Sequence, residues 1–453
     1  MKSHARTYPE HVRAVLVLGL PLIGGHLAQF SIGLTDTVML GWYGVDELAA
    51  LTLANSWFFV LFLMGGGFAW AVMPMVAQFH ARGDQVQCRR ATRMGLWLSL
   101  AYSAAVLPFL LWAKIPLLAL GQKPELAEAA QVYLRIAGWG VVPSLSVLVL
   151  KSYLAALERT QIVLWITVGA AIMNALLNYA LIFGNWGAPE LGIRGAAWAS
   201  LLTNSLSLVG CIAYIQITLP QERLFQRFWR IDAEMMRRVF QLGWPIGLTN
   251  LSEVGLFASS AILMGWLGTI PLAAHGIALQ LTSATFMVHL GLSNVATIRS
   301  GNALGRRDAE NLARGGIAVT GLSVAVSLIT IGVFLSIPEA LIGLFVDSNE
   351  PALPQILAIG AGLLAMAALF QLVDGAQAIA LGLLRGLQDT RLPMIMAAIA
   401  YWLVGLPACL LFGFAFDWGG IGVWMGLVLG LSVAAVLLTL RFWRQKLPQQ
   451  KRV

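Results

Sequence analysis

The chain has 453 residues, of which 58% are apolar and 11% are charged, and it carries a net charge of +8. Soluble domains usually carry about 25% charged residues, so this composition excludes an ordinary soluble protein and indicates an integral membrane protein. The basic residues lie in short loops between apolar runs, where they act as topology signals rather than as a nucleic-acid-binding face. We therefore expect no nucleic-acid partner.

Twelve apolar runs reach the length of about 20 residues that a helix needs to cross a bilayer. In chain order the predicted spans are residues 14–39, 48–78, 94–113, 131–155, 162–184, 192–218, 239–265, 272–298, 315–337, 355–384, 392–415 and 420–441. The first run is too long for the apolar part of a signal peptide, so we interpret it as a retained span. The sequence therefore predicts an all-α integral membrane protein.

The two halves of the chain repeat one another. Residues 19–84 return as residues 243–308 at a constant offset of 224, so that Pro21, Gly67 and Asp84 return as Pro245, Gly291 and Asp308. The repeat predicts two six-helix lobes, residues 1–219 and 239–453, joined by a cytoplasmic linker at 220–238. Six spans per half give both halves the same orientation, so the repeat is parallel, about an axis along the membrane normal.

Proline lies inside the first span of each half. Pro21 and Pro245 each remove a helix hydrogen bond and so predict a bend in spans one and seven. A fixed bend and a hinge for gating are both compatible with this pattern.

Arginine and lysine gather on one side of the predicted membrane protein. Loops of that side hold Arg82, Arg89, Arg90, Arg159, Arg227, Arg230, Arg306, Arg307, Arg385 and Arg391, and the basic tail adds Arg441, Arg444 and Lys446. The opposite loops are richer in acids, such as Asp46, Glu47, Glu125 and Asp417. Since cytoplasmic loops carry the excess of Lys and Arg, we predict a multi-pass protein of the cell membrane with both termini in the cytoplasm.

Three acids fall well inside the predicted spans: Asp36 in span one, Glu253 in span seven and Asp374 in span ten. An ionisable residue in a span costs about 3 kcal/mol or more, so it marks a functional site by default. No Lys or Arg is expected equally deep, and Lys151, near the end of span four, is expected to reach the interface. Such carboxylates could carry a proton, bind a small cation or face a cationic substrate; a purely structural role is the alternative.

Neutral polar residues in spans five and six complete a candidate site. Asn174 and Asn178 are one helical turn apart, so both amides lie on one face, where they could orient a carboxylate or supply oxygens to a cation. Helix-to-helix hydrogen bonding is the alternative. Span six offers the hydroxyls of Ser200 and Thr203. The span histidines, His26, His275 and His289, are expected to be packing residues.

No catalytic signature is present in the sequence. GxxxxGK[ST], HExxH and GxSxG are all missing, so we expect neither an enzyme nor a nucleotide-driven pump. The three cysteines lack metal-site spacing. We expect no cofactor and no tightly bound metal.

Taken together, these residues resemble the multidrug and toxic compound extrusion (MATE) family, in particular its NorM-like bacterial members. The resemblance covers nearly the whole chain. It includes Pro21, the run Leu34-Thr35-Asp36-Thr37-Val38-Met39-Leu40-Gly41, Asn174, Asn178, the Gly192-Ile193-Arg194-Gly195-Ala196-Ala197 start of span six, Glu253, Asp374 and the Leu381-Gly382-Leu383-Leu384-Arg385-Gly386 element.

The resemblance implies a secondary antiporter that exports amphipathic, often cationic, compounds in exchange for H⁺ or Na⁺. Its coupling residues in the N-terminal lobe would be Asp36, Asn174, Asn178 and Ser200, with a transient Na⁺ at Asp36 and Asn178, and those of the C-terminal lobe would be Glu253 and Asp374. Na⁺-coupled members commonly carry Tyr four residues before the latter acid. Here that residue is Phe370, which favours protons or the N-terminal site. The expected partners are small amphipathic molecules and the lipid bilayer, and a monomer is expected.

Two other functions stay open. The first is a flippase for a lipid-linked precursor, from the same broader superfamily, for which a more cationic cavity is expected. The second is a channel, which would need no duplicated, kinked helices with buried acids. The halves are not chemically equivalent, because Asp36 corresponds to Ser260 and Glu253 to Gln29. We therefore expect two distinct sites.

Overall fold

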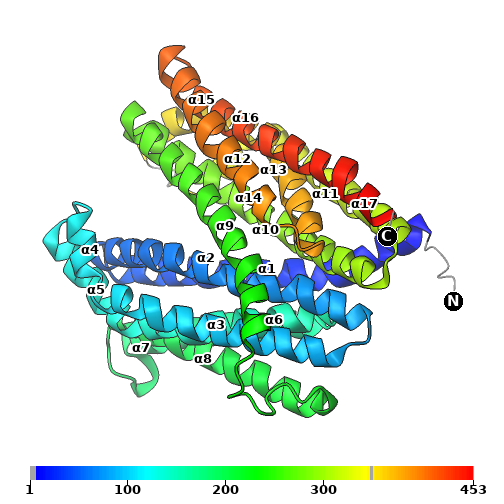
Figure 1. Ribbon diagram of the computed structural model, residues 1–453. Coiled ribbons are helices and arrows are strands. Elements are labelled where there is room, and N and C mark those ends of the chain that lie inside the picture. The colour runs from blue at the N-terminus through cyan, green and yellow to red at the C-terminus, as the bar shows by residue number, and fades with distance from the viewer. Residues whose placement is uncertain (1–6, 347–349, 452–453) are drawn as a thin grey trace. The chain divides into compact units, whose positions relative to one another are not determined.

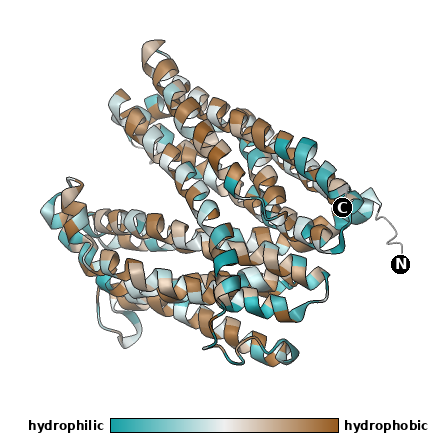
Figure 2. Ribbon diagram, in the orientation of Figure 1, coloured by the Kyte–Doolittle hydropathy of each residue, from teal (hydrophilic) through white to brown (hydrophobic). Residues whose placement is uncertain are grey.

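The computed structural model describes residues 7–346 and 350–451, and within these residues every regular element is a helix (Figure 1). Twelve of the described helical segments are long and apolar enough to cross a membrane. Figure 2 shows hydrophobic residues along the helices and more hydrophilic residues at their ends. The predicted all-α fold with twelve spans is confirmed. The chain termini, residues 1–6 and 452–453, lie outside the described residues, so their cytoplasmic location stays a prediction.

The chain forms two compact units, which we call the N-unit, Gly24–Gly247, and the C-unit, Met1–Ile23 with Leu248–Val453. Helices α1 (Tyr8–Tyr43) and α9 (Ala233–Leu267) each contribute one part to either unit. The other helices of the N-unit are α2 (Val45–Ala81), α3 (Gln85–Leu111), α4 (Lys114–Ala119), α5 (Pro124–Ala137), α6 (Val141–Ala156), α7 (Thr160–Phe183) and α8 (Ile193–Thr218).

The C-unit holds the remaining helices. They are α10 (Thr269–Arg306), α11 (Ala309–Ser336), α12 (Pro338–Gly343), α13 (Leu353–Gly386), α14 (Arg391–Ala398), α15 (Leu406–Leu410), α16 (Gly419–Leu440) and α17 (Leu447–Lys451). Helices α14 and α15 belong to one span, Arg391–Ala415, which is interrupted by π-helical segments at Ile399–Gly405 and Leu411–Ala415. Similarly, α5 and α6 form one span, Pro124–Ala156.

The unit boundaries follow the repeat. The chain leaves the C-unit after Ile23 and leaves the N-unit after Gly247, and these two positions differ by the repeat offset of 224. The units therefore differ from the predicted lobes at both edges. Residues 1–23 belong with the C-unit, and residues 220–247 belong with the N-unit.

In each unit, one glycine lets a helix pack closely against the part of α1 or α9 that belongs to that unit. In the N-unit, a Cβ atom at Gly67 of α2 would lie 2.4 Å from the carbonyl oxygen of Gly243 and 2.5 Å from the nitrogen of Gly247, both in α9. In the C-unit, a Cβ atom at Gly291 of α10 would lie 2.9 Å from the nitrogen of Ile23 in α1. Only glycine allows these close backbone approaches, and the repeat places it in both copies.

The repeat also sets where two equivalent helices begin. Asp84 and Asp308 are the N-cap residues of α3 and α11, and each carboxylate accepts a hydrogen bond from a backbone N–H three residues later, at 3.0 Å. Asp is among the preferred N-cap residues because it satisfies an otherwise unpaired N–H of the first turn. The residues before the caps, Gly83 and Arg307, both have positive φ angles, +76° and +56°.

The segment predicted as a linker, residues 220–238, is docked on α3 of the N-unit. Trp97 Nε1 donates a hydrogen bond of 2.8 Å to the Phe228 carbonyl, and the two rings stack with centroids 5.5 Å apart. Arg90 forms an ion pair with Asp232. Helix α9 begins at Ala233, inside the predicted linker. These contacts place the segment with the N-unit.

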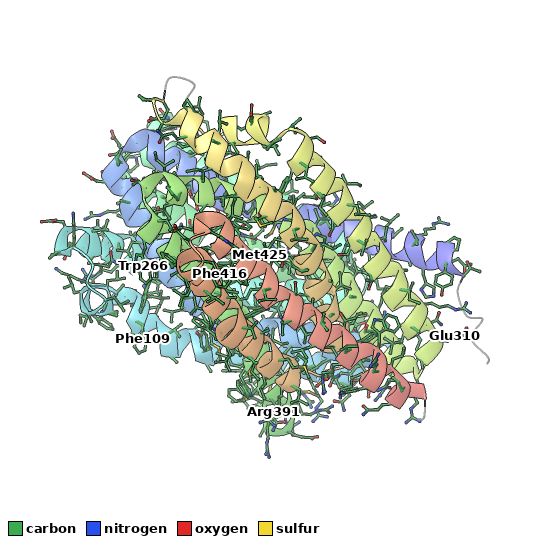
Figure 3. The ribbon with its side chains drawn as sticks, turned by 90° about the horizontal axis from the view of Figure 1, so that it is seen from above. Phe109, Trp266, Glu310, Arg391, Phe416 and Met425 are labelled. Carbon is green, nitrogen blue, oxygen red and sulfur yellow. The ribbon has the colours of Figure 1, made fainter. Side chains whose placement is uncertain are left out.

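Large apolar side chains remain exposed on the helices, as a bilayer-facing surface requires. Trp266, Phe416 and Phe109, which Figure 3 labels, are 68%, 52% and 56% exposed. Each lies at, or within two residues of, the end of a spanning segment. Aromatic residues are enriched at the two membrane–water interfaces, so these side chains fit the ends of the spans.

Candidate functional site

The N-unit brings the four residues of the predicted site together. Asp36 of α1 is 6% exposed, and its Oδ1 accepts a hydrogen bond of 2.5 Å from Nδ2 of Asn178 in α7. Ser200 Oγ of α8 donates to Oδ2 of Asp36 at 3.5 Å. Asn178 Nδ2 also contacts Oδ1 of Asn174 at 3.2 Å. Three helices that are far apart in the sequence therefore converge on one carboxylate.

Local packing fixes the Asp36 side chain. Leu40, one helical turn after Asp36, belongs to the hydrophobic core of the N-unit, together with Ile182 of α7 and Ala196 of α8. Residues one turn apart share a helix face, so burying Leu40 turns Asp36 inward. In the same way, Ala196 lies one turn before Ser200. The core residues thus orient the polar residues of the site.

Neutral donors alone contact the Asp36 carboxylate. Within the described residues, no Lys, Arg or His nitrogen lies within 4.0 Å of it. The Oδ1 atom of Asn178 is buried and has no hydrogen-bond partner in the described part of the chain. A buried carboxylate without a cationic partner gains from taking up a proton or a small cation, and the free amide oxygen could join the carboxylate as a cation ligand.

Tyr133 belongs to the same site, and the sequence analysis did not identify it. It lies on α5, is 3% exposed, and interacts with the Ser200 hydroxyl and electrostatically with Asp36. The only signal in the sequence was a phenol within the apolar residues of span four. Its partner could not be identified without knowing that α5 and α8 pack together.

The C-unit brings Glu253 and Asp374 together. Glu253 of α9 accepts a hydrogen bond of 2.8 Å from Nε2 of Gln377 in α13. Asp374 lies one turn earlier on α13, is 2% exposed, and acts electrostatically on Glu253. Its Oδ1 and the Oε1 of Gln377 are buried without a hydrogen-bond partner among the described residues. Two carboxyl groups and an amide oxygen thus face a common region.

Arg385, which the sequence analysis placed in a loop of the arginine-rich side, lies instead in a helix and acts on one of the deep acids. Its Nη2 donates a hydrogen bond of 2.8 Å to Oδ1 of Asn250, one turn before Glu253 on α9. It also acts electrostatically on Glu253. Asp374 and Arg385 are eleven residues apart on α13, which is three turns and hence one face. The prediction was wrong because α13 continues to Gly386, so Arg385 lies in its last turn and not in a loop.

A second residue missed from the sequence supplies a phenol to the C-unit site. Tyr401, in the π-helical segment of residues 399–405, is fully buried and acts electrostatically on Glu253 and Asp374. Within the described residues its hydroxyl has no hydrogen-bond partner. π-Helical segments are frequent at functional sites.

Phe370, at the position where the resemblance implies a tyrosine, has an aromatic environment. Its ring packs against the rings of Phe257 and Trp424, with centroids 5.8 Å apart in both cases. It therefore serves the core of the C-unit. The phenolic oxygen near the acids comes from Tyr401 instead.

The predicted hinge residues lie inside long helices. Pro21 is within α1 and Pro245 within α9, each two residues before the point where the chain passes between units. Their role as hinges stays a prediction. In the described residues, no group of three or more His, Cys, Asp or Glu residues could hold a metal ion.

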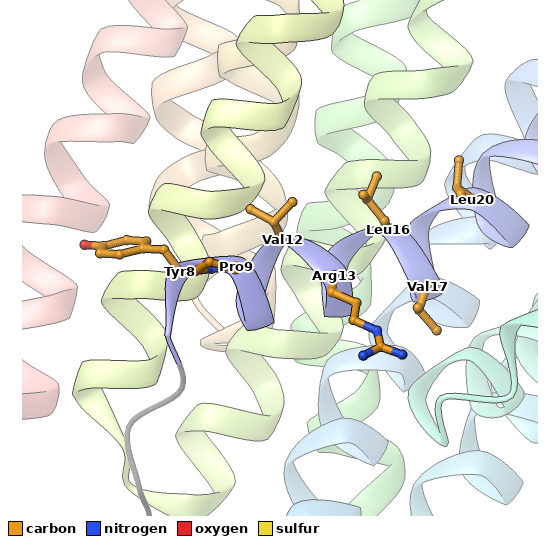
Figure 4. A pocket seen from close by; sticks show the side chains of 7 residues that line it. All are labelled: Tyr8, Pro9, Val12, Arg13, Leu16, Val17 and Leu20. Carbon is orange, nitrogen blue, oxygen red and sulfur yellow. The ribbon is translucent and has the colours of Figure 1, made fainter.

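A shallow concavity on the first part of α1 is distinct from both sites. Figure 4 shows Val12, Leu16 and Leu20 pointing to one side of the helix and Arg13 and Val17 to the other. All its lining residues come from one helix, and Arg13 is the only charged one. It carries none of the acids singled out above.

Comparison with known proteins yields one family. The MatE family model matches residues 21–180 and 245–411, and the two matches begin at Pro21 and Pro245. A probable multidrug resistance protein NorM of Rhizobium meliloti (strain 1021) is 48% identical over 440 residues, covering 97% of this chain and 94% of the relative. One of the same name in Agrobacterium fabrum is 45% identical, covering 97% and 95%.

Solved structures share the fold at low sequence identity. An outward-facing multidrug resistance MATE family transporter of the MOP superfamily matches with a TM-score of 0.88 and 20% identity, covering 98% of this chain and 97% of that one. A eukaryotic MATE transporter matches with a TM-score of 0.87 and 18% identity, covering 98% of both chains.

Proposed function

Because this chain belongs to the MATE family, we propose that it is a secondary antiporter that exports amphipathic, often cationic, drugs or toxic compounds in exchange for H⁺ or Na⁺. The relatives that carry the name of a multidrug resistance protein support the transported class. One observation supports the coupling: Asp36 is buried among neutral donors. We further propose that the protein lies in the inner membrane of the cell with both termini in the cytoplasm.

In this proposal the coupling ion and the drug bind in turn to the Asp36 carboxylate. When the coupling ion binds, it neutralises the carboxylate, and the Asn178 and Ser200 donors hold the side chain in place. When the ion leaves, the carboxylate is available as the counter-charge for a cationic drug. One carboxylate cannot satisfy both at once, so ion binding and drug binding exclude each other.

Coupling also requires that each ligand prefer a different access state, because a ligand with equal affinity for both states shifts no equilibrium. The C-unit acids Glu253 and Asp374 would serve as a second ion or substrate site in the same cycle. Arg385 limits the negative charge there, since it acts on Glu253. The two sites therefore differ in the charged groups that they hold, and we expect them to differ in the ligand that they take.

Proteoliposomes with separately imposed Na⁺ and pH gradients would test the proposal. We expect a fluorescent cation such as ethidium to move against its own gradient when one of the two ion gradients is present. Dissipation of the ethidium gradient without uphill movement would instead indicate a channel. Movement of a lipid-linked precursor without ethidium movement would indicate a flippase.

The Asp36→Asn variant tests the assigned residue. We expect it to abolish uphill ethidium movement while the protein folds normally, because the amide keeps the size of the side chain and removes its charge. Asp46→Asn, a change in the first turn of α2, serves as a matched control. Unchanged ethidium movement in Asp36→Asn at wild-type protein levels would exclude Asp36 as the coupling group.

A further inference from the structure

A groove lies where α8 ends and the docked segment of residues 220–238 begins. It has a volume of about 370 Å³, and all its lining residues belong to the N-unit. Its apolar walls include Ile215, Leu219 and Leu224, which are buried. Three exposed polar residues also line it: Gln216, Arg223 and Gln226. Apolar walls with a few polar groups are typical of a site for a small amphipathic ligand.

Arg93 of α3 fixes the part of the segment that carries Arg223. The Nη2 atom of Arg93 donates a hydrogen bond of 2.8 Å to the Arg223 carbonyl, and its Nε donates to the Leu224 carbonyl. Leu224 is 2% exposed, so its side chain anchors the backbone at the same point. The backbone of Arg223 is therefore held on the N-unit, while its side chain stays exposed at the groove.

The arginines of the segment carry a positive charge that no nearby acid offsets. Arg223, Arg227 and Arg230 are all exposed. Within the described residues, no carboxylate oxygen lies within 4.0 Å of their side-chain nitrogens. The groove therefore lies beside three cationic side chains that are available to an anion.

The acids of the same segment are engaged elsewhere. Asp232 forms an ion pair with Arg90 of α3. Glu222 is 6% exposed, and its Oε2 accepts a hydrogen bond of 3.4 Å from the hydroxyl of Tyr153. Neither carboxylate therefore neutralises the exposed arginines, and the missing negative charge has to come from outside the chain.

The groove also lies at the end of a spanning segment. Helix α8 ends at Thr218, which is the last residue of the sixth span. Two large apolar side chains beside it, Ile217 and Trp229, are 79% and 75% exposed. Trp is enriched where the apolar core of a bilayer meets its head groups, so the groove fits the level of the lipid head groups.

We propose that this groove binds an anionic phospholipid, with the phosphate at Arg223 and the apolar part of the lipid against Leu219 and Leu224. An arginine can hold a phosphate through two parallel hydrogen bonds, and the amides of Gln216 and Gln226 can donate further ones. A zwitterionic lipid fits less well, because its own cation would lie among the arginines. Anionic lipids also attract Arg-rich segments next to a span. This inference goes beyond the proposed export function and does not depend on it.

Lipid binding to the purified full-length protein in detergent tests the inference. Native mass spectrometry measures the affinity for phosphatidylglycerol and for phosphatidylcholine with the same acyl chains, and Tm is measured with either lipid or with inorganic phosphate. The proteins are the wild type, Arg223→Gln, Arg223→Lys and the control Arg391→Gln. The control removes a charge from an exposed site at the start of α14, on the same arginine-rich side. The Tm without added lipid shows that each variant folds.

We expect the wild type to bind phosphatidylglycerol about tenfold or more tightly than phosphatidylcholine, the usual worth of a hydrogen bond to a charged group. Arg223→Gln should lose most of this preference, and Arg223→Lys should keep part of it. Arg391→Gln should change the affinity for phosphatidylglycerol by less than about twofold.

Equal affinity of the wild type for the two lipids would overturn the inference, and this comparison needs no variant. Equal losses in Arg223→Gln and Arg391→Gln would overturn it too, because they would show an effect of overall charge. A rise in Tm with inorganic phosphate as large as that with phosphatidylglycerol would exclude a lipid, since the apolar walls would then have no part in binding. Export is measured separately with ethidium, so each of these outcomes leaves the proposed function intact.

Discussion

Because α2 and α9 approach closely in the N-unit, we expect a single added methyl group at their contact to lower the stability of the protein. In Gly67→Ala, the new Cβ would lie 2.4 Å from the Gly243 carbonyl oxygen and 2.5 Å from the Gly247 nitrogen. Both contacts are with backbone atoms, so no side chain can rotate away. The matched control is Gly169→Ala on α7, where a Cβ would meet no atom within 4 Å.

The two substitutions should change stability in opposite directions. At Gly67 the helices must separate by at least 0.6 Å, because real Cβ contacts do not fall below 3.0 Å. Overpacking of this kind costs about 1–3 kcal/mol, whereas replacing Gly by Ala inside a helix gains about 0.5–1 kcal/mol. We expect Gly67→Ala to lose about 1 kcal/mol net of that gain and Gly169→Ala to gain about 0.5–1 kcal/mol.

Thermal unfolding of the purified protein in detergent measures both effects. With about 2–4 °C of Tm per kcal/mol for units of this size, Gly67→Ala should melt about 2–4 °C lower and Gly169→Ala slightly higher than the wild type. Gly291→Ala, the repeat equivalent in the C-unit, should behave like Gly67→Ala, because its Cβ would lie 2.9 Å from the Ile23 nitrogen. Equal Tm values for Gly67→Ala and Gly169→Ala would refute this reasoning.

Three further substitutions probe the two sites and the docked segment. Asn178→Ala removes the amide that contacts Asp36 and should lower the affinity for the coupling ion by about tenfold or more. This affinity is measured from the ion dependence of ethidium movement, and an unchanged dependence would contradict the assignment. Tyr401→Phe removes only a hydroxyl without a partner in the described residues, so the Tm should stay within about 1 °C of the wild type or rise. Any loss of ion-driven ethidium movement would then be due to the missing phenolic oxygen. A large fall in Tm would instead show a structural role for the hydroxyl. The hydrogen bond and ion pair from Arg90 lower the pKa of Asp232. The pair therefore adds its full stability above the pKa of about 3.9 of an unfolded aspartate and loses it as the pH falls through the lower folded-state pKa. Asp232→Asn should melt lower than the wild type at pH 7, by the small amount of a surface pair, and this difference should shrink as the pH falls below about 4; a difference that stays constant would exclude this linkage.

Hydrophobic periodicity and the repeat predicted most of the fold. Predicting a span from an apolar run requires only the bilayer thickness and the rise per residue of a helix. All twelve spans were therefore predicted from the sequence. The pattern could not show that residues 220–232 dock on α3, since the contacts of Trp97 with Phe228 and of Arg90 with Asp232 join residues more than 130 positions apart.

In the two sites, too, features within one apolar run were predictable from the sequence, and partners on other helices were not. A carboxylate in a span is visible in the sequence because it breaks the apolar run, so Asp36, Glu253 and Asp374 were all singled out. Tyr133 and Tyr401 were missed because a tyrosine in a span is common and its partners lie on other helices. Arg385 was misplaced because the sequence shows where an apolar run ends but not where its helix ends.

The position that corresponds to Asp36 in the C-unit shows how the two units came to differ in where they carry their acids. Ser260 replaces the acid, and its Oγ lies 3.3 Å from Nε2 of His275. Trp424 Nε1 donates to Nδ1 of His275 at 3.0 Å, so Nδ1 is the acceptor and the ring proton lies on Nε2. Ser260 Oγ in turn donates to the Phe257 carbonyl at 2.7 Å. The hydrogen-bond chain is neutral and complete.

A carboxylate at position 260 would not have the surroundings of Asp36, because it would face the Nε2–H of His275, a ring that can itself take up a proton, and no pair of amide side chains among the described residues is there to hold it. We therefore expect Ser260→Asp to fail to rescue Asp36→Asn: the double variant should move ethidium uphill no better than Asp36→Asn alone in the proteoliposome assay. The Ser260→Asp single variant, tested for folding by its Tm, is the control. Recovered movement in the double variant would show that the duplicated positions are interchangeable, and it would remove the reason for assigning coupling to the particular surroundings of Asp36.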